Sequence, residues 1–226
     1  MVVANRFCIK LFNEIMKKYL LKLCLACLFA VVVIGCKKKE KDPEIKFYKV
    51  GDLYSERGEE ALVYKVVTLS GGMYAMAVSL DEAELPWSLE AVKTNANDLD
   101  NGMKNQEAIQ AIQGWKEKYP AFKWCADKNK NGSGGWYFAS PGEMNEMFLT
   151  ELEYEGEMLR LGYYLTKIGA TGFAESDEHG LSPYWSSMET SSLGVAASAN
   201  TSKYSGQGYD KNTVHKVRAI KYIRIY

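Results

Sequence analysis

Residues that build disulfide frameworks and metal centres are scarce in this sequence. The chain has 226 residues, among them two histidines and five cysteines, and only Cys125 follows position 36. An intrachain disulfide is therefore excluded after that position, and so few imidazoles leave little material for a metal cluster. A hydrophobic core must hold this segment together, and a length of about 180 residues is sufficient for one.

A net charge is also lacking. The chain has 28 basic and 28 acidic residues, which gives a formal net charge of +0. Without a basic excess there is no general attraction to polyanions, so we expect no nucleic-acid partner. The composition, with 47% hydrophobic and 25% charged residues, is that of an ordinary globular protein.

The sequence has no hydrophobic run long enough to span a bilayer. Its longest uncharged apolar run, Leu23–Gly35, has 13 residues, whereas a spanning helix needs about 20. A run of this length behind Lys17, Lys18 and Lys22 is typical of a secretory signal peptide. Met16, directly before these lysines, is a candidate start, and translation from the first residue is the open alternative.

The apolar run ends in Val33-Ile34-Gly35-Cys36, which resembles the lipobox of bacterial lipoproteins. The pattern combines an apolar residue, a small residue before the cleavage site, and an obligatory cysteine whose thiol is acylated. The resemblance implies that the signal peptidase recognises Val33, Ile34 and Gly35, and that Cys36 is lipidated. Several acyl chains anchor a protein stably, where one would be marginal. An ordinary secretory signal with an incidental cysteine is the alternative.

These features divide the chain into three parts. Residues 1–35 are the predicted signal peptide, 36–44 a lipidated cysteine with a charged tether, and 45–226 a folded domain. The tether has no apolar residue after Cys36, which is typical of a solvated linker. Its charges also resemble surface-export signals of some Gram-negative lipoproteins. We therefore expect an outer-membrane lipoprotein held in the membrane through Cys36, with both faces of that membrane still open.

Short runs of β-branched and aromatic residues dominate the start of the domain. With glycine-bearing turns between them, such runs predict antiparallel strands. The predicted strands are Ile45–Val50, Ala61–Leu69 and Met73–Leu80, with Gly71-Gly72 as a tight hairpin turn between the last two.

Three later segments have helix signals. Apolar residues at helical spacing predict a helix over Lys104–Tyr119, which Pro120 would end. Ser140–Glu143 is a capping box, and the helix that it opens is expected to reach Tyr154. A third helix is predicted over Glu157–Ile168.

Two further segments are predicted as strands. Trp136–Phe138 is either a short strand or a buried corner. Val214–Ile225 carries apolar residues on both of its faces, which predicts a strand central in a sheet. One face would hold Val217, Ala219 and Ile223, and the other Ile220 and Tyr222.

Five motifs resemble one family in order and spacing. They are Asp100–Gly102, Tyr119–Phe122 with Trp124-Cys125, Gly135–Ser140 with Glu143, Tyr184–Ser187 with Glu189, and Val217–Ile220. Together they resemble the C-terminal domain family of the Lcl collagen-like adhesin, a family of unknown function found in secreted and lipid-anchored bacterial proteins. One departure is Phe138-Ala139, where the family usually has Leu-Pro.

The resemblance implies an α+β, C-type-lectin-like domain. Such a domain has a small antiparallel sheet, two to three helices, long loops, and paired first and last strands. Its motif aromatics equally suit a buried core, and Arg218 inside a strand favours a structural ion pair over a ligand contact.

Chemical motifs are weak. Asp127-Lys-Asn129-Lys-Asn131-Gly132 resembles the first half of a calcium loop, but the position of its bidentate glutamate is Phe138. We therefore predict a polar turn, with no metal and no cofactor. No nucleophile-elbow, zincin or Walker motif occurs, and the family's formylglycine-generating relatives use a cysteine pair that a single Cys125 cannot supply. We expect no enzymatic activity.

Two polar, aromatic-bearing stretches, 95–102 and 182–210, are the predicted binding loops, because loops on a rigid scaffold usually carry function. The candidate ligand contacts are Asp98, Asp100, Asn101, Tyr184, Glu189, Asn200, Tyr204 and Tyr209. The predicted function is a non-catalytic adhesion or binding module for a glycan or a protein. The alternatives are a hydrolase of envelope or host polymers and a purely structural envelope lipoprotein.

Overall fold

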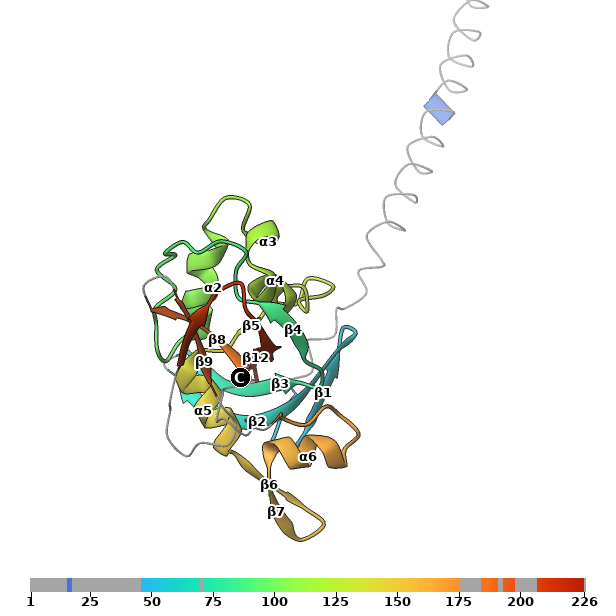
Figure 1. Cartoon of the computed structure of the whole chain (residues 1–226). Coiled ribbons are helices and arrows are strands. Elements are labelled where there is room, and N and C mark those ends of the chain that lie inside the picture. Colours follow the sequence, from blue (N-terminus) through green and yellow to red (C-terminus); the bar gives the residue numbers. More distant parts are fainter. Residues whose placement is uncertain are drawn as a thin grey trace, which may run out of the picture. The chain divides into compact units, whose positions relative to one another are not determined.

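The computed structural model describes residues 16–17, 46–69, 71–174, 184–190, 193–197 and 207–225. The predicted lipobox Val33–Cys36, the tether, Asn200 and Tyr204 lie outside these ranges. Residues from Ile45 to Tyr226 form one compact unit of mixed α+β structure, dominated by antiparallel sheets (Figure 1).

The first sheet has the order β1-β2-β3-β12-β5, and all its neighbours are antiparallel. Its strands are β1 Leu53–Glu56, β2 Glu59–Leu69, β3 Gly72–Ser79, β12 Ala219–Arg224 and β5 Trp136–Phe138. The predicted hairpin between the second and third runs is confirmed, since Leu69 pairs with Gly72. The predicted strand Ile45–Val50 is wrong, because its described residues lie in an irregular segment and a turn before β1.

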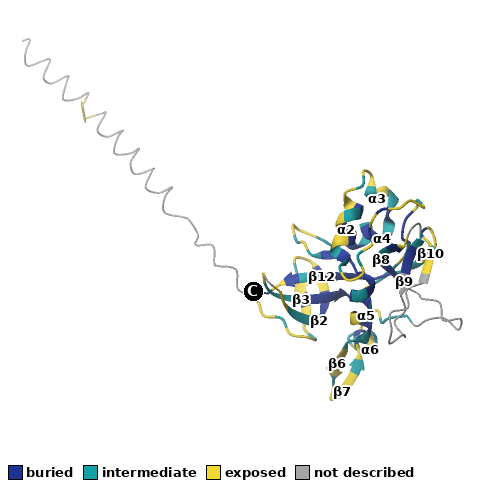
Figure 2. Ribbon diagram, turned by 90° about the vertical axis from the view of Figure 1, so that its left-hand side faces the viewer, coloured by how far each residue is buried: buried dark blue, intermediate teal, exposed yellow. Residues whose placement is uncertain are grey.

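Both faces of this sheet are buried. Side chains alternate along a strand, so odd and even positions of β2 face opposite ways. Ala61 and Val63 pack into one core cluster, whereas Leu62 and Tyr64 pack into another. Helices cover both faces, with α2 and α4 on one side and α5 and α6 on the other (Figures 1 and 2). The strands therefore read as continuous apolar runs.

The second sheet has the order β10-β9-β8-β11-β4. Its strands are β10 Gln207–Asp210, β9 Leu193–Ala197, β8 Tyr184–Thr190, β11 Val214–Val217 and β4 Ala83–Pro86. The β8–β11 pair is parallel and the other pairs are antiparallel. The predicted long loop 182–210 is thus wrong in part, since three strands of this sheet lie within it.

The last predicted strand, Val214–Ile225, is divided between the two sheets at Arg218. β11 belongs to the second sheet, and β12 lies between β3 and β5 in the first. The predicted central position is confirmed for β12, and its two faces enter the two core clusters as the sequence pattern indicates. The expected pairing of first and last strands is wrong, because β1 pairs with β2 and β12 with β3 and β5.

The described helices are shorter and more numerous than the two or three expected. They are α2 Gly102–Gln110, α3 Trp115–Lys118, α4 Pro120–Ala126, α5 Pro141–Leu149 and α6 Leu161–Lys167. None of the described helices is both long and apolar enough to cross a membrane.

Local backbone signals explain where helix boundaries were misjudged. Gly114 adopts φ 70° and separates α2 from α3, so the predicted helix Lys104–Tyr119 is interrupted. Pro120 occupies the first turn of α4 and begins that helix, because proline lacks only an N–H that is unpaired there anyway.

The capping box at Ser140 is confirmed, with reciprocal bonds between Ser140 and Glu143. The helix that it opens ends at Leu149, well before Tyr154. Strands β6 Glu151–Tyr154 and β7 Glu157–Arg160 follow, joined by a turn in which Glu155 and Gly156 both have positive φ. This two-residue hairpin signal overrides the weak helical pattern of the acidic segment.

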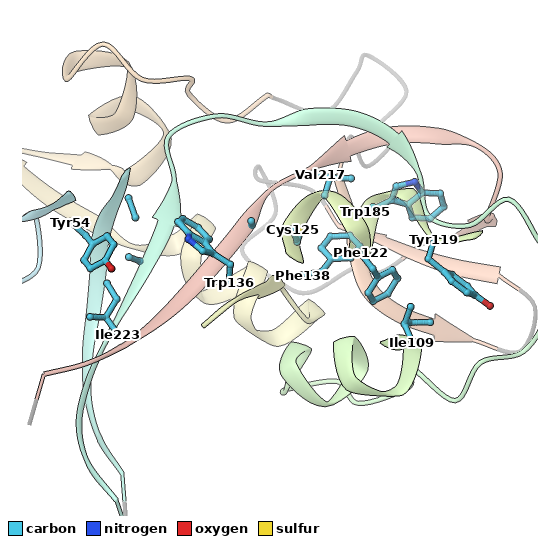
Figure 3. Close-up of a cluster of buried hydrophobic side chains, with 14 of the residues drawn as sticks. Tyr54, Ile109, Tyr119, Phe122, Cys125, Trp136, Phe138, Trp185, Val217 and Ile223 are labelled. Carbon is cyan, nitrogen blue, oxygen red and sulfur yellow. The ribbon is translucent and has the colours of Figure 1, made fainter. Parts of the chain in front are cut away.

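The larger core cluster connects the two sheets. Figure 3 shows it running from Tyr54, Trp136 and Ile223 at one end to Tyr119 and Trp185 at the other. Edge-to-face ring pairs hold its centre, including Phe122 with Phe138 at 5.1 Å between centroids. Aromatic residues of the sequence motifs thus build the core, where burial contributes most of their stabilisation.

Candidate functional site

Glu189 lies beside the segment 94–96, so the structure does bring the two predicted binding stretches together. The Glu189 amide donates to the Ala96 carbonyl at 2.7 Å. Its carboxylate accepts the backbone N–H groups of Thr94 and Asn95 at 2.7 and 2.6 Å. These bonds fix the course of the segment 94–96 against β8.

Glu189 is nevertheless enclosed, and its expected place in an exposed loop is wrong. Its side chain is 1% exposed and forms an ion pair with Lys211, which is 0% exposed. The Lys211 ammonium also donates to the Val92 carbonyl at 2.6 Å and lies 4.4 Å from the centre of the Trp87 ring. The carboxylate therefore satisfies a buried cation and two amides, and no ligand can reach it in this arrangement.

Tyr184 is also interior, against the expectation of an exposed ring. It is fully buried in β8, and its hydroxyl donates to Glu82 at 2.6 Å and accepts the Ala174 N–H at 2.9 Å. Burial and the bond to Glu82 raise the pKa of Tyr184 well above its usual value. The Tyr184 ring packs on Phe148 and Phe173.

Asp98, Asp100 and Asn101 are placed at the start of α2. Asp98 accepts the backbone N–H groups of Asp100 and Asn101 at 3.0 and 2.9 Å, and it pairs with Lys104 at 3.1 Å. The hydrogen bonds from the Asp100 amide and from Lys104 lower the pKa of Asp98 below its usual range. Asn101 caps the helix by accepting the Lys104 N–H at 3.0 Å. The side chains of Asp98 and Asn101 are thus engaged in local structure, while Asp100 is exposed.

Tyr209 lies in β10, half-buried, with its ring against Trp185 and His215. The remaining predicted contacts, Asn200 and Tyr204, fall outside the described residues. The predicted set therefore does not form one exposed face in the described part of the chain.

A cleft of about 540 Å³ lies among the described residues elsewhere on the domain. Five segments contribute to it: the β1–β2 hairpin, the end of β3, the loop after α4, the start of β5 and the loop after α6. Its lining residues are Ser55, Gly58, Glu59, Glu60, Leu80, Asp81, Lys128, Lys130, Trp136, Ile168, Gly169, Ala170 and Thr171.

The Glu59 carboxylate at the floor of this cleft has hydrogen-bond donors on both of its oxygens. One oxygen of Glu59 accepts the Lys130 amide at 2.7 Å and the Ser133 hydroxyl. The other accepts the Trp136 indole N–H at 2.8 Å and pairs with Lys221 at 2.8 Å. Burial by itself would raise the pKa of Glu59, but the bonds from Lys221, Lys130 and Trp136 outweigh it, so the pKa lies below the usual value. Glu59 stays ionised and organises the loop 130–136.

A second ion pair closes one side of the floor. Lys128 pairs with Asp81 at 2.5 Å, and its ammonium lies 4.0 Å from the centre of the Trp124 ring and 5.8 Å from that of Trp136. Asp81 is 64% exposed, whereas the Lys128 side chain is 17% exposed. This lysine is therefore held in place by one carboxylate and two aromatic rings.

The walls of the cleft are tied to the core. Arg218, fully buried, donates to the carbonyls of Ser79 at 2.9 Å and of Thr171 and Gly172 at 3.0 Å, and it pairs with Glu82 at 2.8 Å. The predicted structural ion pair of Arg218 is confirmed. Because its bonds connect the end of β3 to the loop after α6, Arg218 holds two walls at a fixed separation.

On the rim, Glu60 and Lys130 are exposed and make no ion pair within the described residues. The cleft and its floor together contain three carboxylates and three ammonium groups, so their formal charges cancel. They are Glu59, Glu60, Asp81, Lys128, Lys130 and Lys221.

The calcium-like segment has become part of this cleft. Asp127 pairs with Lys123, Asn129 bonds to the backbone of Ala126 and Trp136, and Asn131 donates to the Arg57 carbonyl. These side chains bond to separate partners and do not converge on one point. Across the described ranges, no group of three or more acidic, histidine or cysteine side chains is arranged to hold a metal ion.

Cys125 lies in α4, just before the loop that lines the cleft, and it is buried and forms no disulfide. Burial raises the pKa of its thiol well above the usual value. The thiol is therefore kept protonated, which makes it a poor nucleophile.

The sequence analysis missed the cleft residues, and the reason is their dispersion. Glu59, Asp81, Lys128 and Thr171 come from four separate segments, each reading as an ordinary turn or strand end. No family model, no curated protein and no solved structure matches the chain. The cleft is therefore interpreted from its own geometry.

Proposed function

We propose that this chain is a non-catalytic binding or adhesion lipoprotein of the outer membrane, anchored through Cys36 and contacting a glycan or protein with its folded domain. The observation that supports binding most directly is the cleft of about 540 Å³. Its volume lies in the range of roughly 300–1,000 Å³ that small-molecule sites occupy. Two of its carboxylates, Glu59 and Asp81, are held in ion pairs, which suits recognition better than proton transfer.

The test is a glycan and matrix-protein array, probed with the full processed chain in detergent. We expect binding to a restricted set of related probes. A chain that is correctly folded and binds no member of the array contradicts this function and favours a purely structural envelope lipoprotein. Release of products from envelope polymers would instead favour the hydrolase alternative.

The anchor rests on the pattern Val33–Cys36 behind a short apolar run. We expect Cys36→Ser to remain an unprocessed precursor without acyl label, because the thiol is the acceptor of the lipid. Cys125→Ser is the control and should be processed and labelled normally. Protease treatment of intact cells then separates the two faces of the outer membrane, and digestion of the domain is expected if it is on the cell surface.

We also propose that the domain is a distant C-type-lectin-like relative of the Lcl C-terminal domain. Five residues of the sequence motifs are buried, which supports the interpretation that the motifs specify a fold. They are Trp136, Glu143, Trp185, Glu189 and Arg218. They therefore say little about the ligand. An experimental structure that superposes on C-type-lectin-like domains would test the relationship.

A further inference from the structure

We propose that the cleft lined by Trp136, Lys128 and Glu60 binds an uncharged, hydroxyl-rich segment of an oligosaccharide. This inference rests on the proposed binding function and names both its site and the chemical class of its ligand. The site differs from the loop face that the sequence predicted.

The charges of the cleft argue for a neutral ligand. Two of its carboxylates already have a cation, Glu59 at 2.8 Å from Lys221 and Asp81 at 2.5 Å from Lys128. Of the charged groups in the cleft, only Glu60 and Lys130 have no ion pair with a described residue, and their signs are opposite. A charged ligand would gain from one of them and be repelled by the other. A hydroxyl can donate to a carboxylate and accept from an ammonium group, so a polyol can form hydrogen bonds with both Glu60 and Lys130.

The uncharged lining suits the same chemistry. Ser55 and Glu60 are cross-strand partners, so they share the outer face of the β1–β2 hairpin. Thr171, in the loop after α6, is a further hydroxyl-bearing residue of the lining. Leu80, Ile168 and Ala170 add apolar surface, against which the C–H faces of a sugar can pack. Trp136 is only 4% exposed, so it contributes an edge of the floor and not a stacking platform.

The cleft is held in shape before any ligand arrives. Arg218 fixes the Thr171 and Gly172 carbonyls, and Asn131 ties the α4–β5 loop to the Arg57 carbonyl in the hairpin at 2.7 Å. A site whose walls are already ordered loses less conformational entropy on binding. This matters for a neutral ligand, because no strong Coulomb attraction compensates for that loss.

The first experiment measures binding of the full chain, in detergent, to neutral, uronate-bearing, sulfated and amino oligosaccharides of equal length. We expect the neutral probes to bind best. Their affinity should change less than about two-fold between roughly 50 and 500 mM NaCl, since salt screens only charge–charge attraction. Preferential binding of a charged series with a steep loss in salt would overturn the inference.

The second experiment fills the cleft. Ser55→Trp places an indole in the cleft from an exposed strand position, where an aromatic residue is well tolerated. Leu53→Trp is the matched control, on the same strand and face but outside the cleft. We expect at least about a ten-fold loss of affinity for Ser55→Trp and less than two-fold for the control. Equal affinities of the two variants would place the ligand elsewhere.

The third experiment changes the charge of the rim without filling it. Glu60→Lys should shift the preference of the array toward uronate probes, and Lys130→Glu toward amino probes. Both positions are exposed, so folding should be unaffected. If the native chain binds an oligosaccharide but neither variant changes which probes are preferred, the assignment of the binding site to this cleft is wrong. The proposed binding function is then unaffected. If the native chain binds none of these oligosaccharides, the inference about the cleft fails, and the binding function fails with it only if the matrix-protein array is negative as well.

Discussion

Two buried sites of this protein contain the same three residue types, a glutamate, a lysine and a tryptophan. In each, a glutamate accepts N–H groups and pairs with a buried lysine, whose ammonium lies near a tryptophan ring. Glu189, Lys211 and Trp87 form one site. Glu59, Lys221 and Trp136 form the other, with the ammonium 5.5 Å from the centre of the ring.

The difference lies in what covers them. Glu189 lies between β8 and the segment 94–96, and its neighbours enclose it completely. The Glu59 side chain is as little exposed, at 1%, but it stands at the end of a hairpin, where five segments line a cleft. The same set of groups, a glutamate, a lysine and a tryptophan, therefore stabilises the fold at Glu189 and borders a candidate binding site at Glu59. The segments that meet at each place make the difference.

The strongest test of this likeness removes either carboxylate. Glu189→Ala and Glu59→Ala should each lower the free energy of unfolding by about 3–5 kcal/mol, because each leaves a lysine buried without its partner. Urea denaturation at neutral pH measures both. The control pair Glu189→Leu with Lys211→Met should recover most of the loss. If Glu189→Ala weakened ligand binding but left stability unchanged, Glu189 would be a ligand contact after all.

A smaller effect separates the two tryptophans. Trp136→Phe removes an indole donor to the Glu59 carboxylate, and hydrogen bonds to charged groups contribute about 1.5–3 kcal/mol. Trp87→Phe removes a donor to the neutral Ser186 carbonyl, for which we expect about 0.5–1.5 kcal/mol. Thermal or urea unfolding of the two variants provides the measurement. A larger loss of unfolding free energy for Trp87→Phe than for Trp136→Phe would show that ring packing, not the charge of the acceptor, determines the size of the effect.

A third prediction concerns the residues that the sequence placed in a binding loop. Asn101→Ala removes the N-cap of α2 and should lower stability by about 1 kcal/mol. Ligand affinity should not change, because the cap lies outside the cleft. Lys104→Ala is the control, since it keeps the cap and loses only an exposed ion pair, for which we expect less than about 1 kcal/mol. A loss of affinity in Asn101→Ala with unchanged stability would restore the original loop site.

The smallest effects should appear in the pH dependence of stability. Glu59 has a lowered pKa, so its contribution is complete above the unfolded value of about 4.3 and is lost as pH falls through its folded pKa. Glu143 forms no ion pair with a described residue, and burial raises its pKa despite bonds from Ser140, Tyr137 and Gly102. Its contribution is therefore present below about pH 4.3 and is lost as pH rises through the folded pKa.

Carbon-13 NMR of labelled glutamate carboxyls measures both titrations directly, with Glu59→Gln and Glu143→Gln as assignment controls. We expect the resonance of Glu59 to titrate below the ordinary glutamate value and that of Glu143 above it. Titration of both above the ordinary value would mean that burial outweighs the lysine partner of Glu59, and titration of both below it would mean that hydrogen bonds outweigh burial at Glu143.

Features that depend on neighbouring residues could be predicted from the sequence. The capping box at Ser140, the hairpin before Gly72 and the two apolar faces of β12 were readable because each depends on local spacing. The helix interrupted at Gly114 was misjudged because a single left-handed glycine outweighs several well-spaced apolar residues.

Which polar residues are accessible to solvent depends on the tertiary structure. Glu189 and Tyr184 looked like loop residues because the region 182–210 is rich in serine and glycine, and their burial depends on pairing with distant segments. The cleft could not be predicted, since Glu59, Asp81, Lys128 and Thr171 meet only when the first sheet and the loops after α4 and α6 are in place. Local propensity acts over a few residues, whereas the enclosure of a charge depends on every segment that packs around it.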